Sequence, residues 1–249
     1  EAYAWAYDDS SDNIGLISQN GSGNVAQTYI GDDNGDNNFT AIAQNGMDNY
    51  AYVDNYTDTT GNTTGILQNG SDNDAEVYLD EDADRNLTAI TQNGSDNSAY
   101  VEIYDSSNAN AVVIAQNGSN NDSYVYIDDD SNRNYVGTTQ NGSDNESGVE
   151  IEEESNNNVV ALLQAGSGNE LDMEGSDGIK YSSSNNFVAV SQAGTDNATE
   201  IEIEDDSDWN FVAVSQAGSD NEIDDIEIDN DSDYNFVAAA QTGSGNEIS

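Results

Sequence analysis

Carboxylates are the residues of this chain best suited to chemistry. The 249 residues include 50 Asp and Glu but only 3 Lys and Arg, so the formal charge is −47. Ca²⁺ prefers such oxygen ligands and takes about 6–8 of them. The candidate cation ligands are Asp48, Asp72, Asp96, Asp144, Asp196, Asp220, Glu200 and Glu202. The competing interpretation is a solvated acidic surface, as expected for a secreted protein of a halophilic or marine organism.

Other chemistry finds little support in the sequence. Paired carboxylates could serve a glycosidase, but pairs on an exposed repeat lack a cleft and an acid with a raised pKa, so we predict that the chain is not an enzyme. Without Cys or His, thiol and imidazole catalysis, disulfides and zinc or haem ligation are excluded. The charge argues against nucleic acid, and no apolar run approaches the ~20 residues of a membrane span. We therefore expect no cofactor beyond Ca²⁺ or other counterions, no nucleic-acid partner and no membrane insertion.

The elements that position these residues form a repeat. High charge with few large apolar residues is typical of disorder, but the pattern Asn-x5-Gln-x-Gly-x2-Asn occurs ten times, with its Gln residues 24, 25 or 28 positions apart. Disorder does not keep such register. We interpret residues 1–249 as one repeat array, with a half-unit at 1–12 and repeats starting near 13, 38, 62, 86, 110, 134, 158, 186, 210 and 235.

Each unit is predicted to be a strand, a turn, a second strand and a second turn. The first strand alternates its faces between the Asn and the Gln, as from Asn210 to Gln216, and Ala99, Val101 and Ile103 share one face of a second strand. Two short strands cannot bury a core alone, but stacked units can. The expected fold is all-β: a two-sheet β-solenoid with cross-β stacking and about ten rungs of 24 residues.

Stacking explains why amides occupy inward positions. Each amide carries a donor and an acceptor, so a column of amides spaced about 4.8 Å apart can bond along its own length. The predicted ladder residues are Asn13, Asn38, Asn62, Asn86, Asn110, Asn134, Asn158, Asn186, Asn210, Asn235, Gln19, Gln44, Gln68, Gln92, Gln116, Gln140, Gln164, Gln192, Gln216 and Gln241.

The outward side of the first strand forms a different surface. No first strand holds an Asp or Glu between its Asn and the Gly after its Gln. Its outward residues are apolar or small, which favours contact with a partner over exposure to water. The candidate lateral packing face is Phe187, Ala189, Phe211, Ala213, Phe236 and Ala238; the alternative is that small residues keep an exposed sheet flat.

On these residues the sequence resembles the curlin repeat of curli-type functional amyloids, Ser-x5-Gln-x-Gly-x2-Asn-x-Ala-x3-Gln. The central Gln-x-Gly-x2-Asn is kept in all ten units, but Asn replaces the leading Ser and the trailing Gln is mostly aliphatic, as at Ile103 and Ile127. The resemblance implies a secreted, extracellular protein of the cell surface or biofilm matrix that forms cross-β fibres. It also implies a nucleator, a secretion pore and chaperones as partners.

Two functions follow as expectations. The N-terminal segment aligns with a second strand, and the C-terminal unit holds only a fragment of one, so the two ends are complementary. We expect a structural subunit that polymerises head to tail into an extracellular fibre, with lateral contacts between copies as a further expectation. The alternative is a monomeric acidic β-solenoid that binds Ca²⁺ or mineral surfaces.

Overall fold

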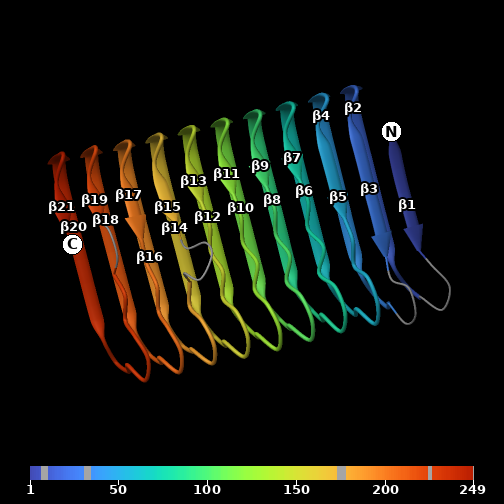
Figure 1. Cartoon of the computed structure of the whole chain (residues 1–249). Helices are drawn as coiled ribbons and strands as arrows, with labels where there is room; N and C mark the ends of the chain where they lie inside the picture. Colours follow the sequence, from blue (N-terminus) through green and yellow to red (C-terminus); the bar gives the residue numbers. More distant parts are fainter. Residues whose placement is uncertain (7–10, 31–34, 173–177, 224–225, 249) are drawn as a thin grey trace.

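The computed structural model describes residues 1–6, 11–30, 35–172, 178–223 and 226–248. Of the predicted half-unit 1–12, residues 7–10 lie outside the described residues. The described chain is built from strands and turns, arranged as a stack of rungs in two parallel sheets (Figure 1). The expected β-solenoid of about ten rungs is therefore confirmed.

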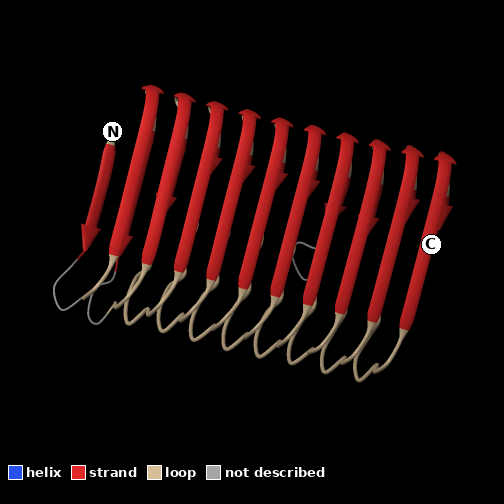
Figure 2. Ribbon diagram, turned by 180° about the vertical axis from the view of Figure 1, so that it is seen from behind, coloured by secondary structure: helices blue, strands red, loops and turns tan. Residues whose placement is uncertain are grey.

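One long strand per rung forms the first sheet, here called the long-strand sheet. It has ten strands, and each pairs in parallel with the next over nine residues without a slip. The strands are β2 (Ile14–Ser22), β4 (Phe39–Met47), β6 (Thr63–Ser71), β8 (Leu87–Ser95), β10 (Ala111–Ser119), β12 (Tyr135–Ser143), β14 (Val159–Ser167), β16 (Phe187–Thr195), β18 (Phe211–Ser219) and β20 (Phe236–Ser244). Successive strands lie almost parallel, so the sheet is flat (Figure 2).

The second sheet, here called the short-strand sheet, has eleven strands because β1 pairs with β3 below the first complete rung. Its strands are β1 (Ala2–Ala6), β3 (Val25–Ile30), β5 (Tyr50–Val53), β7 (Asp74–Ala75), β9 (Ser98–Ala99), β11 (Asp122–Ser123), β13 (Glu146–Ser147), β15 (Glu170–Asp172), β17 (Ala198–Glu200), β19 (Glu222–Ile223) and β21 (Glu247–Ile248). Most of these strands are much shorter than the sequence alternation predicts.

Backbone geometry ends the short strands early. In the fourth rung, the side chains of Ala99, Val101 and Ile103 are buried as predicted, but the ladder pairing stops at Ala99. The N–H of Tyr100 still donates to Ser123 in the next rung at 3.1 Å, but Glu102, Ile103 and Tyr104 have φ angles of 136°, 97° and 72°. Positive φ rotates their peptide planes out of the extended conformation, so their N–H groups no longer meet the neighbouring rung.

The core lies between the two sheets and runs along the whole stack. Val and Ile from the long strands pack against Val, Ile and Leu from the short-strand side, and 33 hydrophobic residues of the described part of the chain are buried. Each rung contributes only a few of them, so the core is continuous only because the rungs stack.

Candidate functional site

The ten predicted glutamines form one column inside the stack. Each Nε2 donates to the Oε1 of the next rung's Gln, at 2.7 Å from Gln19 to Gln44 and 3.0 Å from Gln216 to Gln241. The same Nε2 donates to the backbone carbonyl five residues ahead, as from Gln116 to Asn121 at 2.9 Å. The nine glutamines after Gln19 are at most 5% exposed. These bonds satisfy the buried amides and set the register of every rung on the next.

The predicted asparagine column beginning at Asn13 is also present but bonds differently from the expected amide-to-amide ladder. The Oδ1 of each Asn accepts the backbone N–H of the next Asn, at 2.8 Å from Asn38 to Asn13 and again from Asn235 to Asn210. Most of the Nδ2 groups donate instead to a turn carbonyl, as from Asn86 to Ser107 at 2.8 Å. This column therefore joins each turn to the backbone of its neighbours.

A third column does bond amide to amide. It contains the second Asn of the repeat, and each Nδ2 donates back to the preceding rung, as from Asn97 to Asn73 at 2.8 Å. A fourth column, on the outer face, was missed by the sequence analysis: Asn20, Asn45, Asn69, Asn93, Asn117 and Asn141 align, and their amides are joined at 2.9–3.2 Å where bonds are made. The signal was an Asn directly after the Gln in six consecutive units.

The aspartates proposed as cation ligands lie in a single column in the turn after the long strand. All six are exposed, and all have left-handed backbone, with φ between 52° and 56°. Gly23, Asn120, Gly168 and Gly245 take the corresponding place in other rungs, also with positive φ. Gly, Asn and Asp are the residues that adopt this conformation most readily, so the turn geometry explains the aspartates without a bound ion.

Glu200 and Glu202 lie apart from that column, on the short-strand side. Lys180 Nζ forms an ion pair with Glu202 and lies 3.6 Å from the Oε1 of Glu204. Among the described residues, no group of three Asp or Glu side chains is close enough to hold a metal ion. The structure therefore does not bring the proposed cation ligands together into one site.

Tyrosines and acids alternate on the outer side of the short-strand sheet. Tyr52 donates a hydrogen bond to Asp54 at 2.6 Å, Tyr78 to Glu76 in the next rung, and Tyr100 to Glu102 in the one after. The order of the Tyr and its acid along the chain reverses from one rung to the next. The ring centroids are 5.6 Å apart between Tyr52 and Tyr78, and 5.4 Å apart between Tyr78 and Tyr100. Burial, followed by the neighbouring carboxylates, raises the pKa of these tyrosines above its ordinary value. Phenols thus separate carboxylates that would otherwise stack directly.

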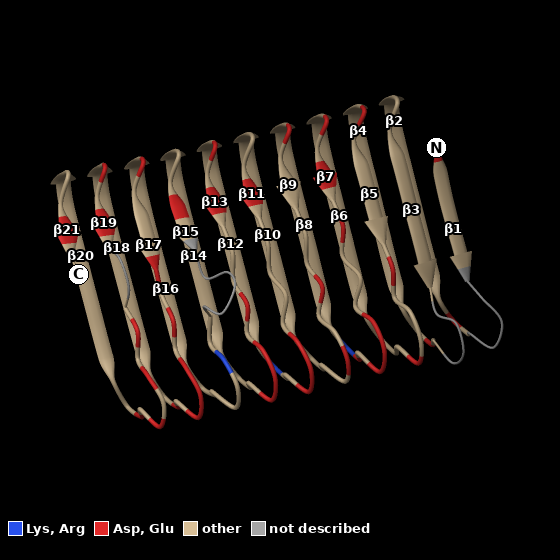
Figure 3. Cartoon of the chain, viewed as in Figure 1, with Lys and Arg blue, Asp and Glu red and all other residues tan. Residues whose placement is uncertain are grey.

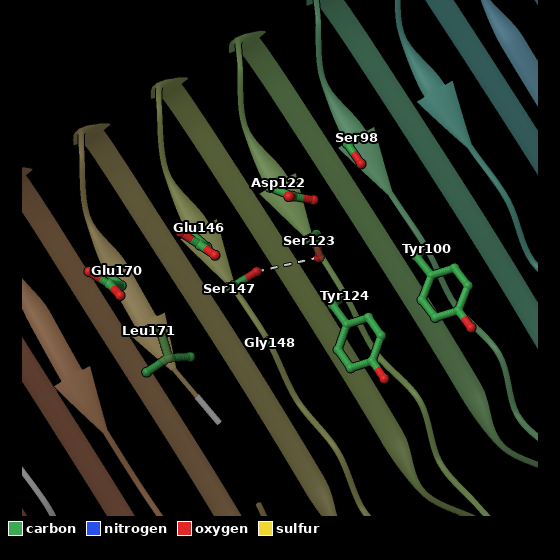
Figure 4. Close-up of a pocket in the computed structure, with 10 residues that line it drawn as sticks. All are labelled: Ser98, Tyr100, Asp122, Ser123, Tyr124, Glu146, Ser147, Gly148, Glu170 and Leu171. Carbon is green, nitrogen blue, oxygen red and sulfur yellow. Dashed lines mark hydrogen bonds between the residues drawn. The ribbon is translucent and has the colours of Figure 1, made fainter. Parts of the chain in front are cut away.

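Tyr100, Tyr124 and Gly148 occupy the same position in three successive rungs. Because Gly148 has no side chain, a pocket of about 260 Å³ opens beside Tyr124. Asp122, Glu146 and Glu170 line its side from successive rungs (Figure 4). Beneath it, Ser147 donates to Ser123 at 3.4 Å. Most of the lining is acidic and polar.

The turns between rungs carry further acids, as Figure 3 shows. Burial, and then the carboxylates of Asp128 and Asp105, raise the pKa of Asp129 from 3.8 to about 6. Burial also raises the pKa of Asp80, with Asp105 as the second cause. These pKa shifts follow first from burial and second from the stacking of like charges.

The proposed lateral packing residues all lie on the outer face of the long-strand sheet. Phe187, Phe211 and Phe236 stack face to face with centroids 4.9 and 5.0 Å apart. Ala189, Ala213 and Ala238 align beside them in the next outward column. Phe236 is 71% exposed, so the last member of this apolar column faces solvent.

No model of a known protein family matches the chain. No curated protein matches it either. The described residues contain no helix capable of spanning a membrane.

The chemistry that this arrangement offers is hydrogen bonding between rungs. The buried amides of each rung bond to neighbouring rungs with nearly the same donors and acceptors along the stack. The candidate functional site is therefore the set of amide columns together with the two outer faces.

Proposed function

We propose that this chain is a structural subunit that polymerises head to tail into an extracellular cross-β fibre, a functional amyloid of a biofilm or surface matrix. The observation that carries the proposal is the glutamine column. Its side-chain bonds are directional: each Nε2 donates to the Oε1 of the following rung. Among the described residues, the Oε1 of Gln19 therefore has no preceding glutamine, and the Nε2 of Gln241, which donates to the carbonyls of Glu222 and Asn246, has no following one. In this column, the C-terminal end of the stack would supply an amide donor to a second copy, and the N-terminal end would supply an amide acceptor.

The exposed edges of the long-strand sheet support the same conclusion. The N–H of the first residue of each long strand donates to the next rung, as from Phe211 to Asn235 at 2.9 Å. In β20 the equivalent N–H, on Phe236, has no further rung among the described residues. Open edges with unpaired backbone groups favour strand addition. The apolar core also reaches this end, because Val237 and Ala239 are only partly buried.

A second copy would place its β2 on β20 and continue both sheets. In that join, its β1 lies level with β21, so the two residues of β21 have to move aside. Secretion, and the nucleator, pore and chaperones that the curlin resemblance implies, belong to this proposal and rest on the repeat motif alone.

Electron microscopy tests the fibre directly. The protein is imaged in high salt with Ca²⁺, and again after EDTA treatment and desalting. Filaments with a layer line near 4.8 Å are expected, and their dissolution on desalting would show that cations offset the repulsion between acids. Discrete particles about 50 Å long in both conditions, which is roughly ten rungs, would refute the fibre and leave the acidic solenoid that binds Ca²⁺ or mineral.

A single-residue variant sharpens this test. Ala240 lies in β20 four residues after Phe236, so its N–H also points away from β18 in the parallel ladder. Ala240→Pro removes that donor and should slow elongation at least about tenfold. Ala240→Ser is the matched control, because it keeps the N–H and Ser already occupies this column at Ser191 and Ser215. Equal elongation rates for both variants would contradict growth at this edge.

A further inference from the structure

The outer face of the long-strand sheet is uncharged throughout the stack. Four outward columns cross its ten strands, and they contain no Asp, Glu, Lys or Arg. Several large apolar side chains stand open on it: Leu16 is 54% exposed, Leu87 45%, Tyr135 44% and Leu163 44%. In a chain of charge −47, such a face is not explained by solubility.

The outer face of the long-strand sheet also contains a groove. The second outward column holds only Ala, Gly and a few larger residues; the first column beside it is bulky in most rungs, whereas the third is mostly Ser, Ala and Thr, with Leu67 and Leu163 as its large members. A groove results in the first four rungs, lined by Leu16, Ala41, Gly65, Leu67 and Ala89 among others. A Cβ added to Gly65 would meet no atom within 4 Å, so the groove floor is open. Ridges of one sheet can enter such grooves of another.

The area of this outer face is large enough for a stable protein interface. Ten strands about 4.8 Å apart, with four outward columns about 6.7 Å apart, give a face of roughly 1,000 Å². A stable protein interface buries about 800 Å² on each partner. The flatness of the sheet (Figure 2) lets a second flat sheet follow it over the whole length, which a strongly twisted sheet would not allow.

Charge and spacing select the partner. The acids lie along the short-strand side and the turns, so two copies can approach closely only through their long-strand sheets. A second copy also has the same rung spacing, and its columns can stay in step along the entire contact. We propose that the outer faces of two long-strand sheets pack against each other, joining two copies of this chain side by side through a dry, uncharged interface.

Mass measurements test the pairing. In molar NaCl, where repulsion is screened beyond about 3 Å, wild-type fibres should show the mass per length of two chains, each 26.5 kDa, for every ten rungs. Ala189→Glu with Ala213→Glu places charges on the face and should halve that value. Ser98→Glu with Ala198→Glu is the matched control, because it adds the same charge to the short-strand sheet beside acids at Asp122, Glu170 and Glu222. Its fibres should keep the doubled value.

Thiol labelling gives a second measurement, which reports the exposure of one position instead of the mass of the fibre. The chain has no Cys, so a single Cys reports on one position. Ala161 on the proposed interface and Ser98 on the other sheet are both partly exposed in the single chain. Maleimide should label Ala161→Cys at least about tenfold more slowly than the same variant carrying Ala189→Glu and Ala213→Glu, whereas Ser98→Cys should react equally in both backgrounds.

The outcomes separate this inference from the proposed fibre. Discrete particles of two chains would support the pairing while refuting the polymer. Fibres one chain wide, or fast labelling of Ala161→Cys in the wild-type background, would refute the pairing and leave the polymer. A double width that persists in folded Ala189→Glu, Ala213→Glu protein would also overturn it.

Discussion

At the scale of single residues, the buried glutamines combine two properties that normally conflict. A primary amide without partners inside a core costs roughly 1–3 kcal/mol, yet Gln116 is fully buried. It donates to Gln140 at 2.9 Å, accepts from Gln92 at 3.0 Å, and donates to Asn121 at 2.9 Å. The stack supplies every partner, so the residue is stable only in register.

The first prediction compares two neighbouring amides. Gln116→Ala leaves the Oε1 of Gln140 without its ladder donor and opens a cavity, so we expect a loss of about 2–4 kcal/mol in the free energy of unfolding. Asn117→Ala removes the exposed ladder bonds to Asn93 and Asn141, where water can replace them, and should cost under about 1 kcal/mol. Denaturant titration followed by circular dichroism checks both. Equal losses would mean that burial of the glutamine column is not what holds the rungs together.

The same residues show what the sequence could and could not predict. The Gln column was predictable because its parity with the apolar residues is fixed in every unit. The assignment of Asp96 and its equivalents to cations, made from their charge, stays a prediction. Their φ of about 55° is a conformational property that the repeat pattern alone does not show. The pairing of Lys180 with Glu202 joins different rungs and has no counterpart in other units.

At the scale of elements, each long strand starts to turn at the glycine in its second-last position. Gly118 has φ of 131°, and a Cβ built on it would lie 1.7 Å from the carbonyl oxygen of Gly142 in the next rung. Adjacent rungs therefore approach so closely at this turn that no side chain fits between them.

The second prediction contrasts this glycine with another. Gly118→Ala should lower the free energy of unfolding by at least about 2 kcal/mol, because it adds backbone strain and a clash. Gly65→Ala lies where a Cβ meets nothing within 4 Å and should raise it by about 0.4–1 kcal/mol, because Ala restricts the unfolded chain. Thermal melts of both variants provide the measurement. A neutral Gly118→Ala would contradict the described turn.

Long and short strands differ in how well sequence predicts them. The long strands alternate strictly from their first residue to the Gln, and all ten are present in the structure. The short strands alternate as well, and the inward positions were predicted correctly at Val101 and Ile103. Alternation does not reveal the sign of φ, however, so the early end of the ladder at Ala99 could not be predicted.

At the scale of the whole molecule, the charge is sorted onto one side. Several stacked acids have pKa values raised by burial first, including Asp54, Asp74, Asp80 and Glu152. A carboxyl whose pKa is higher in the folded than in the unfolded state binds its proton more readily when folded. Its unfavourable contribution to stability is present at neutral pH and disappears as the pH falls.

The third prediction follows from that sign. Lowering the pH from 7 to 4 should raise the melting temperature, and for Asp129 the gain should lie between about 6 and 3.8, its folded and ordinary pKa values. Asp129→Asn should melt higher than wild type at pH 7 and gain less on acidification. Melting curves at several pH values in constant salt test this. A melting temperature that falls steadily from pH 7 to 4 would show that stacked acids do not govern the stability.

The opposed directions of the amide columns have a further consequence, which concerns dipoles. Glutamine amides donate toward the following rung, as from Gln44 to Gln68, whereas the inner asparagine amides donate toward the preceding one, as from Asn73 to Asn49. Their dipoles along the stack therefore oppose each other, and parallel strands add little of their own. Unlike an α-helix, whose aligned peptides build a macrodipole, this stack accumulates little axial polarisation as it lengthens. The amide dipoles thus contribute about the same energy to the addition of a distant rung as to the addition of an early one.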